Sequence, residues 1–258
     1  MNLHTYAPDF SVTGRRALLT GAGRGIGLAM ARALAAGGCA VAIQDIELDV
    51  ATREADAINL AGGNAIALDG DIQDLSLPDR LVEQTVAQFG GVDILVNNAA
   101  IQRSNDFLTY PMEEMRSQLN ANILAATRLC QLVIPHMQKT NWGRIINIGS
   151  IQGLRGNASG PTYAMSKAAM QNLSAGLANC YGAFGITVNC VAPGWFDTHR
   201  NRGDFNSPEH KVQKGKAIPL RRVGEPEDCA GVVVLLCSRA GEYITGQTIR
   251  VDGGMSLR

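Results

Sequence analysis

The stretch that most constrains the fold is near the N-terminus, where an apolar run, a cluster of glycines and a helical pattern follow one another. The apolar run covers residues 16–20, the glycines fall within Thr20–Gly27, and the helical pattern covers residues 28–36. An apolar run that ends at glycines indicates a buried strand. Glycines let backbone N–H groups approach a ligand, and a helix N-terminus carries partial positive charge. The unit therefore predicts a phosphate-binding loop, with a ligand-free glycine turn as the alternative.

The spacing of these glycines limits which phosphate-containing ligands the loop could bind. Ile26 interrupts the Gly-x-Gly-x-x-Gly pattern, so the loop follows Thr-Gly-x-x-x-Gly-x-Gly instead. A Gly-Lys-Ser/Thr sequence does not follow, which excludes a nucleoside-triphosphate loop. Asp45 ends the next apolar run, 18 residues after Gly27, where an acidic residue hydrogen-bonds the adenosine ribose of a dinucleotide. Its carboxylate would repel a 2′-phosphate, which favours NAD over NADP, although Arg24 in the loop could contact such a phosphate.

Apolar runs and helical patterns alternate along the rest of the chain. This alternation predicts one α/β domain over residues 1–258, a Rossmann fold with a doubly wound, seven-stranded parallel sheet and helices on both faces. The longest stretch without periodicity lies within residues 195–216, and we predict a mobile lid over a pocket there. The predicted strands are 16–20, 40–45, 65–68, 92–96, 143–150, 186–191 and 247–252, and the predicted helices are 28–36, 48–61, 76–89, 111–138, 161–184 and 226–238.

Composition excludes several classes of protein. The 23 basic and 23 acidic side chains cancel, which argues against a nucleic acid or an anionic membrane as the main partner. No apolar run reaches the roughly 18 residues of a membrane span, and the N-terminus lacks a signal-peptide pattern. The six cysteines are dispersed and the four histidines lack metal-ligand spacing. We therefore expect a cytoplasmic protein with buried thiols and without a metal site.

Tyr163 and Lys167 form the pair with the clearest chemistry. Four residues apart on a predicted helix, they lie on the same face. A free phenol has a pKa near about 10 and is a poor acid or base at neutral pH. A neighbouring ammonium favours the phenolate, so the spacing predicts a lowered pKa for Tyr163. The spacing alone is a weak signal, and other residues must support it.

Further polar or turn-forming residues follow the other predicted strands. Asp71 could accept a hydrogen bond from an adenine amino group, with capping of the next helix as an almost equal alternative. Ligands of doubly wound sheets bind at the carboxyl ends of the strands. We therefore expect the residues at these ends to meet at one edge of the sheet: Gly21, Asp45, Asp71, Asn97, Ser150 and Pro193.

Taken together, these motifs resemble those of the short-chain dehydrogenase/reductase family over roughly residues 13–254. Ala100 stands where glycine is usual, a change from one small residue to another. The resemblance implies an NAD(P)-dependent enzyme that interconverts a secondary alcohol and a ketone and that assembles as a homotetramer. The matching segments are Thr20–Gly27, Asn97–Ala99, Ser150, Tyr163 with Lys167, Pro193–Gly194 and Val251–Gly254.

The resemblance also implies roles for individual residues. Tyr163 would be the general acid/base, Lys167 would lower its pKa and bind the nicotinamide ribose, and Ser150 would hold the substrate oxygen. Asn122 matches the active-site asparagine of the family best, with Asn120 as a second possibility. The predicted cofactor site comprises Gly21, Arg24, Gly25, Ile26, Gly27, Asp45, Asp71, Ile72, Asn98, Tyr163, Lys167, Pro193, Gly194 and Thr198.

The substrate is predicted from the polar residues that should line its pocket. Ser150, Gln152, Tyr163 and Trp195 are the expected contacts, and Gln102, Arg103 and Arg155 would add groups that suit a polyhydroxylated or carboxylate-bearing substrate. The two arginines could equally be solvated surface charges.

The segments at 97–103 and 149–152 resemble those of sugar-acid and polyol dehydrogenases such as the gluconate 5-dehydrogenases. A sugar acid, sugar or polyol is therefore the expected substrate. The alternatives are an NADPH-dependent 3-oxoacyl-thioester reductase and, in another class, a non-catalytic dinucleotide sensor.

Overall fold

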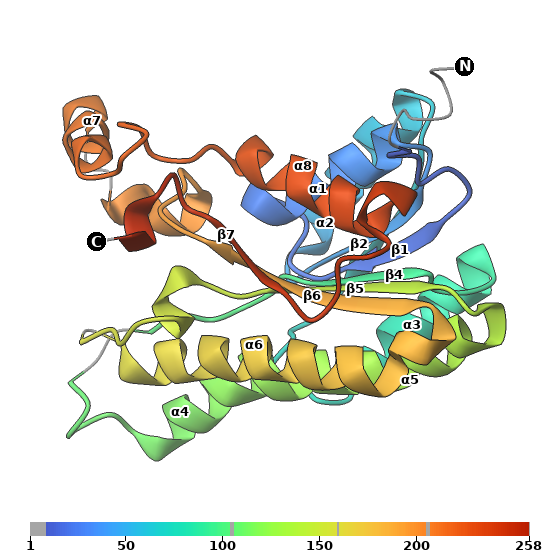
Figure 1. Ribbon diagram of the computed structural model, residues 1–258, viewed down its shortest axis with the longest axis horizontal. Coiled ribbons are helices and arrows are strands. Elements are labelled where there is room, and N and C mark those ends of the chain that lie inside the picture. The colour runs from blue at the N-terminus through green and yellow to red at the C-terminus, as the bar shows by residue number, and fades with distance from the viewer. Residues whose placement is uncertain (1–8, 104–105, 159, 205–206, 258) are drawn as a thin grey trace.

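The computed structural model describes residues 9–103, 106–158, 160–204 and 207–257 (Figure 1). Its centre is a seven-stranded sheet in the order β3-β2-β1-β4-β5-β6-β7, parallel at every pairing. This confirms the predicted doubly wound α/β fold. The strands are β1 (Arg16–Leu19), β2 (Ala40–Asp45), β3 (Asn64–Asp69), β4 (Ile94–Asn97), β5 (Gly143–Ile148), β6 (Ile186–Pro193) and β7 (Thr248–Val251).

Helices cover both faces of the sheet. In the view of Figure 1, α1, α2 and α8 lie above the sheet, and α3, α4, α5 and α6 lie below it. Successive strand residues point to opposite faces, so Leu18 and Leu19 of β1 belong to two different hydrophobic cores. The helices are α1 (Gly25–Ala36), α2 (Leu48–Leu60), α3 (Leu77–Phe89), α4 (Met112–Leu119), α5 (Ala125–Thr140), α6 (Pro161–Tyr181), α7 (Pro208–Lys216) and α8 (Ala230–Cys237).

The predicted helix over 111–138 is interrupted. A π-helical turn, Asn120–Leu124, separates α4 from α5. Such turns accommodate one extra residue within a helix and are frequent at functional sites. Apolar periodicity did not reveal the turn, because the positions on either side of it keep a helical spacing.

The segment predicted to be a lid contains more regular secondary structure than expected. Residues 199–204 form a 3₁₀ turn and residues 208–216 form α7, so the prediction of an irregular segment is wrong for those residues. Residues 205 and 206 lie outside the described residues. Ser207 caps α7 by accepting from the backbone N–H of His210. The helix escaped detection because it is almost entirely polar and its one large apolar side chain, Val212, is exposed.

Five of the six cysteines are buried free thiols, as predicted, whereas Cys180 is exposed on α6. Burial raises the pKa of the Cys190 thiol to about 11 and that of Cys130 to about 12. Within the described residues, no helix combines the length and the apolarity needed to cross a membrane.

Candidate active site

A cleft of about 410 Å³ lies over the carboxyl ends of the strands. It is situated where the sheet order reverses, because β1 pairs with β2 on one side and with β4 on the other. The cleft brings together all the predicted cofactor residues and all the predicted substrate residues except Arg103 and Arg155. Asn122 lies behind it. The lining includes Gly21, Arg24, Gly25, Ile26, Gly27, Asp45, Asp71, Ile72, Asn98, Ser150, Gln152, Tyr163, Lys167, Pro193, Gly194, Trp195 and Thr198.

The glycine loop packs too closely for side chains. A Cβ atom at Gly21, where φ is 59°, would lie 2.9 Å from Ala99 Cα, and one at Gly27 would lie 2.3 Å from the Gly21 carbonyl oxygen. Arg24 is the N-cap residue of α1 but makes no side-chain capping hydrogen bond, and the first turn holds no acidic residue. This helix N-terminus is therefore free of competing side-chain acceptors, which fits the pyrophosphate of a dinucleotide.

Asn98 supports the loop from behind. Its Nδ2 atom donates to the carbonyl oxygens of Thr20 (3.0 Å) and Gly21 (2.7 Å). The side-chain hydroxyl of Thr20 in turn accepts from the backbone N–H groups of Asn98 and Ala99. The Asn98 amide thus fixes the backbone of the glycine loop.

Two carboxylates lie at the end of the cleft formed by β2 and β3. Asp45 is buried and accepts from the backbone N–H groups of Gly23 (3.1 Å) and Glu47 (3.2 Å). Arg24, beside it, forms an ion pair with Glu47 at 2.7 Å.

Asp71 accepts from the Gln73 backbone N–H at 2.9 Å. It does not cap α3, whose N-cap residue is Ser76, so the capping alternative from the sequence is not seen.

Ser150, Tyr163 and Lys167 lie together at the other end of the cleft. Ser150 follows β5, and its Oγ atom accepts from the backbone N–H of Gln152 at 3.1 Å and is hydrogen-bonded to the Tyr163 hydroxyl. Tyr163 and Lys167 are both buried, one turn apart on α6. The Lys167 Nζ atom lies 5.7 Å from the centre of the Tyr163 ring and donates to the Ile148 carbonyl at 2.7 Å.

The electrostatics of this trio differ from the sequence-based expectation. Burial raises the pKa of Tyr163, whereas the charge of Arg200 and hydrogen bonds from Ser150 and Arg200 act in the opposite direction. The predicted lowering of the Tyr163 pKa by Lys167 is therefore wrong for the protein alone. The largest effect is the burial of the phenol itself. Burial, aided by the charge of Arg200, also lowers the pKa of Lys167 to about 7, so this amine carries only part of a positive charge near neutral pH.

Asn122 lies in the π-helical turn, behind the cleft. Its side chain exchanges hydrogen bonds with the backbone of Ile101 (2.7 and 2.9 Å) and donates to the Ser166 hydroxyl at 3.0 Å. It also lines a small cavity of about 10 Å³ together with Lys167, close to the minimum size for one water molecule. Asn120, the alternative in the sequence, is not among the residues that line either cavity.

The two arginines predicted to contact the substrate do not line the cleft. Arg103 pairs with Glu114 at 3.1 Å, and Arg155 is exposed beyond the cleft. Instead, Arg200 lines it, and its Nη2 atom donates to the Ala100 carbonyl oxygen at 2.5 Å. The sequence placed Arg200 within the lid but did not single it out, because the apolar pattern does not show which side chain of the lid lines the cleft. Arg200 does so although it remains exposed to solvent.

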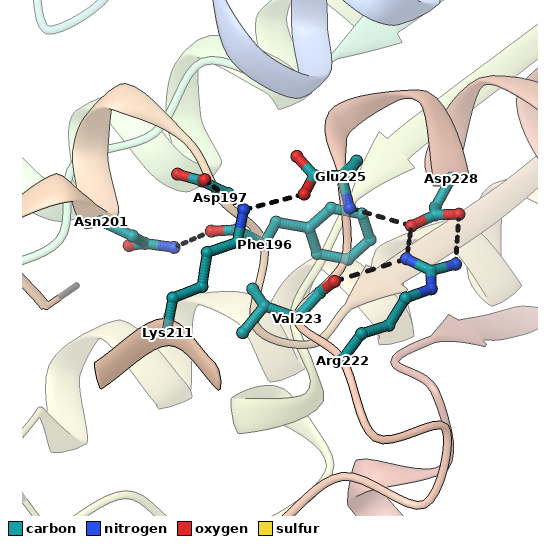
Figure 2. A network of polar contacts seen from close by, with 8 residues as sticks. All are labelled: Phe196, Asp197, Asn201, Lys211, Arg222, Val223, Glu225 and Asp228. Atoms are coloured by element: carbon teal, nitrogen blue, oxygen red, sulfur yellow. Dashed lines mark hydrogen bonds and ion pairs between the residues drawn. The ribbon is translucent and has the colours of Figure 1, made fainter. Parts of the chain in front are cut away.

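A network of polar contacts fixes the segment that carries Arg200 (Figure 2). Lys211 of α7 forms ion pairs with Asp197 and, at 2.8 Å, with Glu225. The Asn201 side chain donates to the Phe196 carbonyl at 3.0 Å. The backbone also links Asp197 to the Gly224 carbonyl at 2.8 Å. Residues 196–201 are thereby held against the segment before α8.

Comparison with known proteins agrees with this geometry. A family model described as enoyl-(acyl carrier protein) reductase matches residues 21–256. The 3-oxoacyl-[acyl-carrier-protein] reductase of Escherichia coli K12 is 39% identical over 95% of this chain and 98% of its own length. The structure of a gluconate 5-dehydrogenase from Burkholderia cenocepacia in complex with NADP and tartrate has a TM-score of 0.90 and 33% identity, covering 96% of this chain and 98% of that one. A short-chain type dehydrogenase/reductase from Mycobacterium marinum has a TM-score of 0.89 and 31% identity, over 96% and 98% of the two chains.

Proposed function

Because the chain belongs to the short-chain dehydrogenase/reductase family and is an NAD(P)-dependent oxidoreductase acting on CH–OH groups, we propose that it interconverts a secondary alcohol and a ketone of a sugar acid, sugar or polyol. The observation that carries this proposal is the meeting of Ser150, Tyr163 and Lys167 in the cleft that also holds the glycine loop. An alcohol carbon placed there has a proton acceptor and a hydride acceptor within one site.

In the proposed mechanism, the Tyr163 hydroxyl exchanges a proton with the substrate oxygen while Ser150 Oγ holds that oxygen by a hydrogen bond. Lys167 would bind the nicotinamide ribose through its buried amine, and Asn122 would position Lys167 from behind through the small cavity that both residues line. Pro193, Gly194 and Thr198 would hold the carboxamide. The nicotinamide ring, when bound, supplies or accepts the hydride.

The substrate class is supported by polar groups that line the cleft. Gln102 and Gln152 contribute amides to this lining, and Arg200 adds a cation beside Tyr163. Amides suit hydroxyl groups, and a cation suits an acid. The structure of the Burkholderia gluconate 5-dehydrogenase in complex with tartrate agrees with this choice.

A second candidate is reduction of a 3-oxoacyl thioester, which the name of the Escherichia coli relative favours. A panel of sugar acids, polyols, hydroxysteroids and β-ketoacyl thioesters, followed by the absorbance of the reduced cofactor, separates the two. Turnover of sugar acids or polyols is the expected result. If only the thioesters were turned over, the protein would instead be assigned as a 3-oxoacyl-thioester reductase.

We further propose NAD as the preferred cofactor, because the buried Asp45 carboxylate would repel a 2′-phosphate and Arg24 is already paired with Glu47. The kcat/KM with NAD is expected to exceed that with NADP by about 10-fold or more, and Asp45→Ser should shift the ratio toward NADP by about 10- to 100-fold. Asp71→Ser is the matched control and should affect both cofactors alike. The Burkholderia relative was crystallised with NADP, and a preference of the wild-type enzyme for NADP would refute this proposal.

The assembly is proposed to be a cytoplasmic homotetramer. Large apolar side chains are exposed on the side of the sheet covered by α4, α5 and α6, namely Met112, Leu124 and Met165. A second copy would remove this apolar surface from water. Light scattering that gives a particle of 27.4 kDa would contradict the proposed assembly.

A further inference from the structure

The end of the cleft near Tyr163 contains a guanidinium that has no carboxylate partner in the part of the chain that the structure describes. Arg24 and Arg200 are the arginines that line the cleft. Arg24 pairs with Glu47, whereas no carboxylate of the described residues lies within 4.0 Å of Arg200. The acidic residues of the lining, Asp45 and Asp71, follow β2 and β3 at the other end of the cleft.

The backbone around Arg200 is held in place, and its side chain extends from there to the other wall of the cleft. The network around Lys211 and Asp197 holds the backbone on which Arg200 stands (Figure 2). From there the guanidinium extends to the carbonyl oxygen of Ala100, which follows β4, a contact between residues 100 positions apart in the chain. It also lies within hydrogen-bonding reach of the Tyr163 hydroxyl. The Arg200 guanidinium therefore lies next to the Tyr163 hydroxyl, which exchanges a proton with the substrate in the proposed mechanism.

The present partners of Arg200 satisfy only part of its hydrogen-bonding capacity. A guanidinium has five N–H donors in a rigid fork that matches the two oxygens of a carboxylate. A backbone carbonyl and a phenol are neutral acceptors, and a carboxylate binds a guanidinium about twice as strongly as such groups do. An anionic substrate would thus displace or supplement these contacts at little cost.

We propose that Arg200 binds a carboxylate of the substrate, placed one or two carbons from the reacting carbon, and so selects 2- or 3-hydroxy acids and their keto forms. The spacing follows from the hydrogen bond between the Arg200 guanidinium and the Tyr163 hydroxyl. A substrate oxygen held at Tyr163 would place a carboxylate bound by this guanidinium only one or two carbons away. This inference rests on the proposed function, and it specifies which end of a sugar acid reacts.

The test compares each acid with its uncharged methyl ester. The wild-type enzyme is expected to favour the acid, and Arg200→Gln should lower the ratio of the two kcat/KM values by about 10- to 100-fold. Arg200→Lys keeps the charge without the fork and should give an intermediate ratio. Any effect of the change on Tyr163 itself acts on both substrates and cancels in the ratio. Arg155→Gln, a surface arginine outside the cleft, is the matched control and should leave the ratio unchanged.

An unchanged ratio in Arg200→Gln would overturn the proposal while leaving the proposed oxidoreductase activity intact. A second measurement does not depend on turnover. Calorimetric titration of tartrate, a 2,3-dihydroxy dicarboxylate, should show binding to the wild-type protein that weakens by about 10-fold in Arg200→Gln. Equal binding to both proteins, or no binding to the wild type, would count against Arg200. Failure of the whole substrate panel with this binding difference present would instead refute the proposed function alone.

Discussion

Replacing Tyr163 by phenylalanine is expected to lower kcat by about 10²- to 10⁴-fold and to leave cofactor binding unchanged. The substitution keeps the buried ring and removes only the hydroxyl that is hydrogen-bonded to Ser150. The proton of the alcohol then has no acceptor at this position, whereas the glycine loop and Asp45 are untouched. Steady-state kinetics gives the loss in kcat, and titration of the cofactor into the protein gives its affinity.

Tyr181→Phe is the matched control for this experiment. Tyr181 is the last residue of the same helix, α6, and packs against the hydrophobic core away from the cleft. The Tyr181→Phe variant should therefore retain the wild-type kcat. Near-normal turnover in Tyr163→Phe would remove Tyr163 from the mechanism and with it the role of the phenol.

Lys167→Met is expected to have two opposite effects, a loss of about 10²- to 10³-fold in kcat/KM and a gain in stability near pH 7. Lys167 is buried, with a folded-state pKa of about 7 against an ordinary value of 10.5. As the pH falls from 10.5 to 7, the unfolded chain binds a proton at this amine and the folded chain does not. The free energy of unfolding of the wild type therefore decreases through this window, and it stops decreasing below about pH 7.

Methionine does not titrate, so it removes this pH dependence. It also removes the hydrogen bond to the Ile148 carbonyl, which reduces the gain. We expect the Tm of Lys167→Met to exceed that of the wild type by about 2–4 °C at pH 7, with the difference narrowing toward pH 10. Calorimetry at a series of pH values measures it. A Tm below that of the wild type at pH 7 and a constant difference across the series would show that the buried amine carries no such cost.

The sequence predicted the sheet and the proximity of Tyr163 and Lys167 for physical reasons. Buried parallel strands are continuous apolar runs, so β2 was predicted with its observed limits, residues 40–45, and the ends of the others shifted by a few residues. Tyr163 and Lys167 were predictable as a pair because helix geometry alone makes them neighbours.

Features that depend on tertiary contacts were not predictable in the same way. Arg200 acquires its position from Ala100, 100 residues away in the chain, and from the ion pairs of Lys211. Arg103 directly follows residues that line the cleft, but its ion pair with Glu114 on α4 keeps its side chain outside. The Tyr163 pKa was predicted in the wrong direction because spacing shows which charges are near but not how deeply the phenol is buried, and that burial has the largest effect on its pKa.

The π-helical turn between α4 and α5 has a consequence for how this part of the chain can change. Deleting one residue there would restore an unbroken α-helix, yet it would rotate α4 relative to α5 by about 100°. Asn122 would then leave its place between Ile101 and Ser166. We therefore expect insertions and deletions in residues 120–124 to impair this enzyme, even though an unbroken α-helix would form more easily than the π-helical turn.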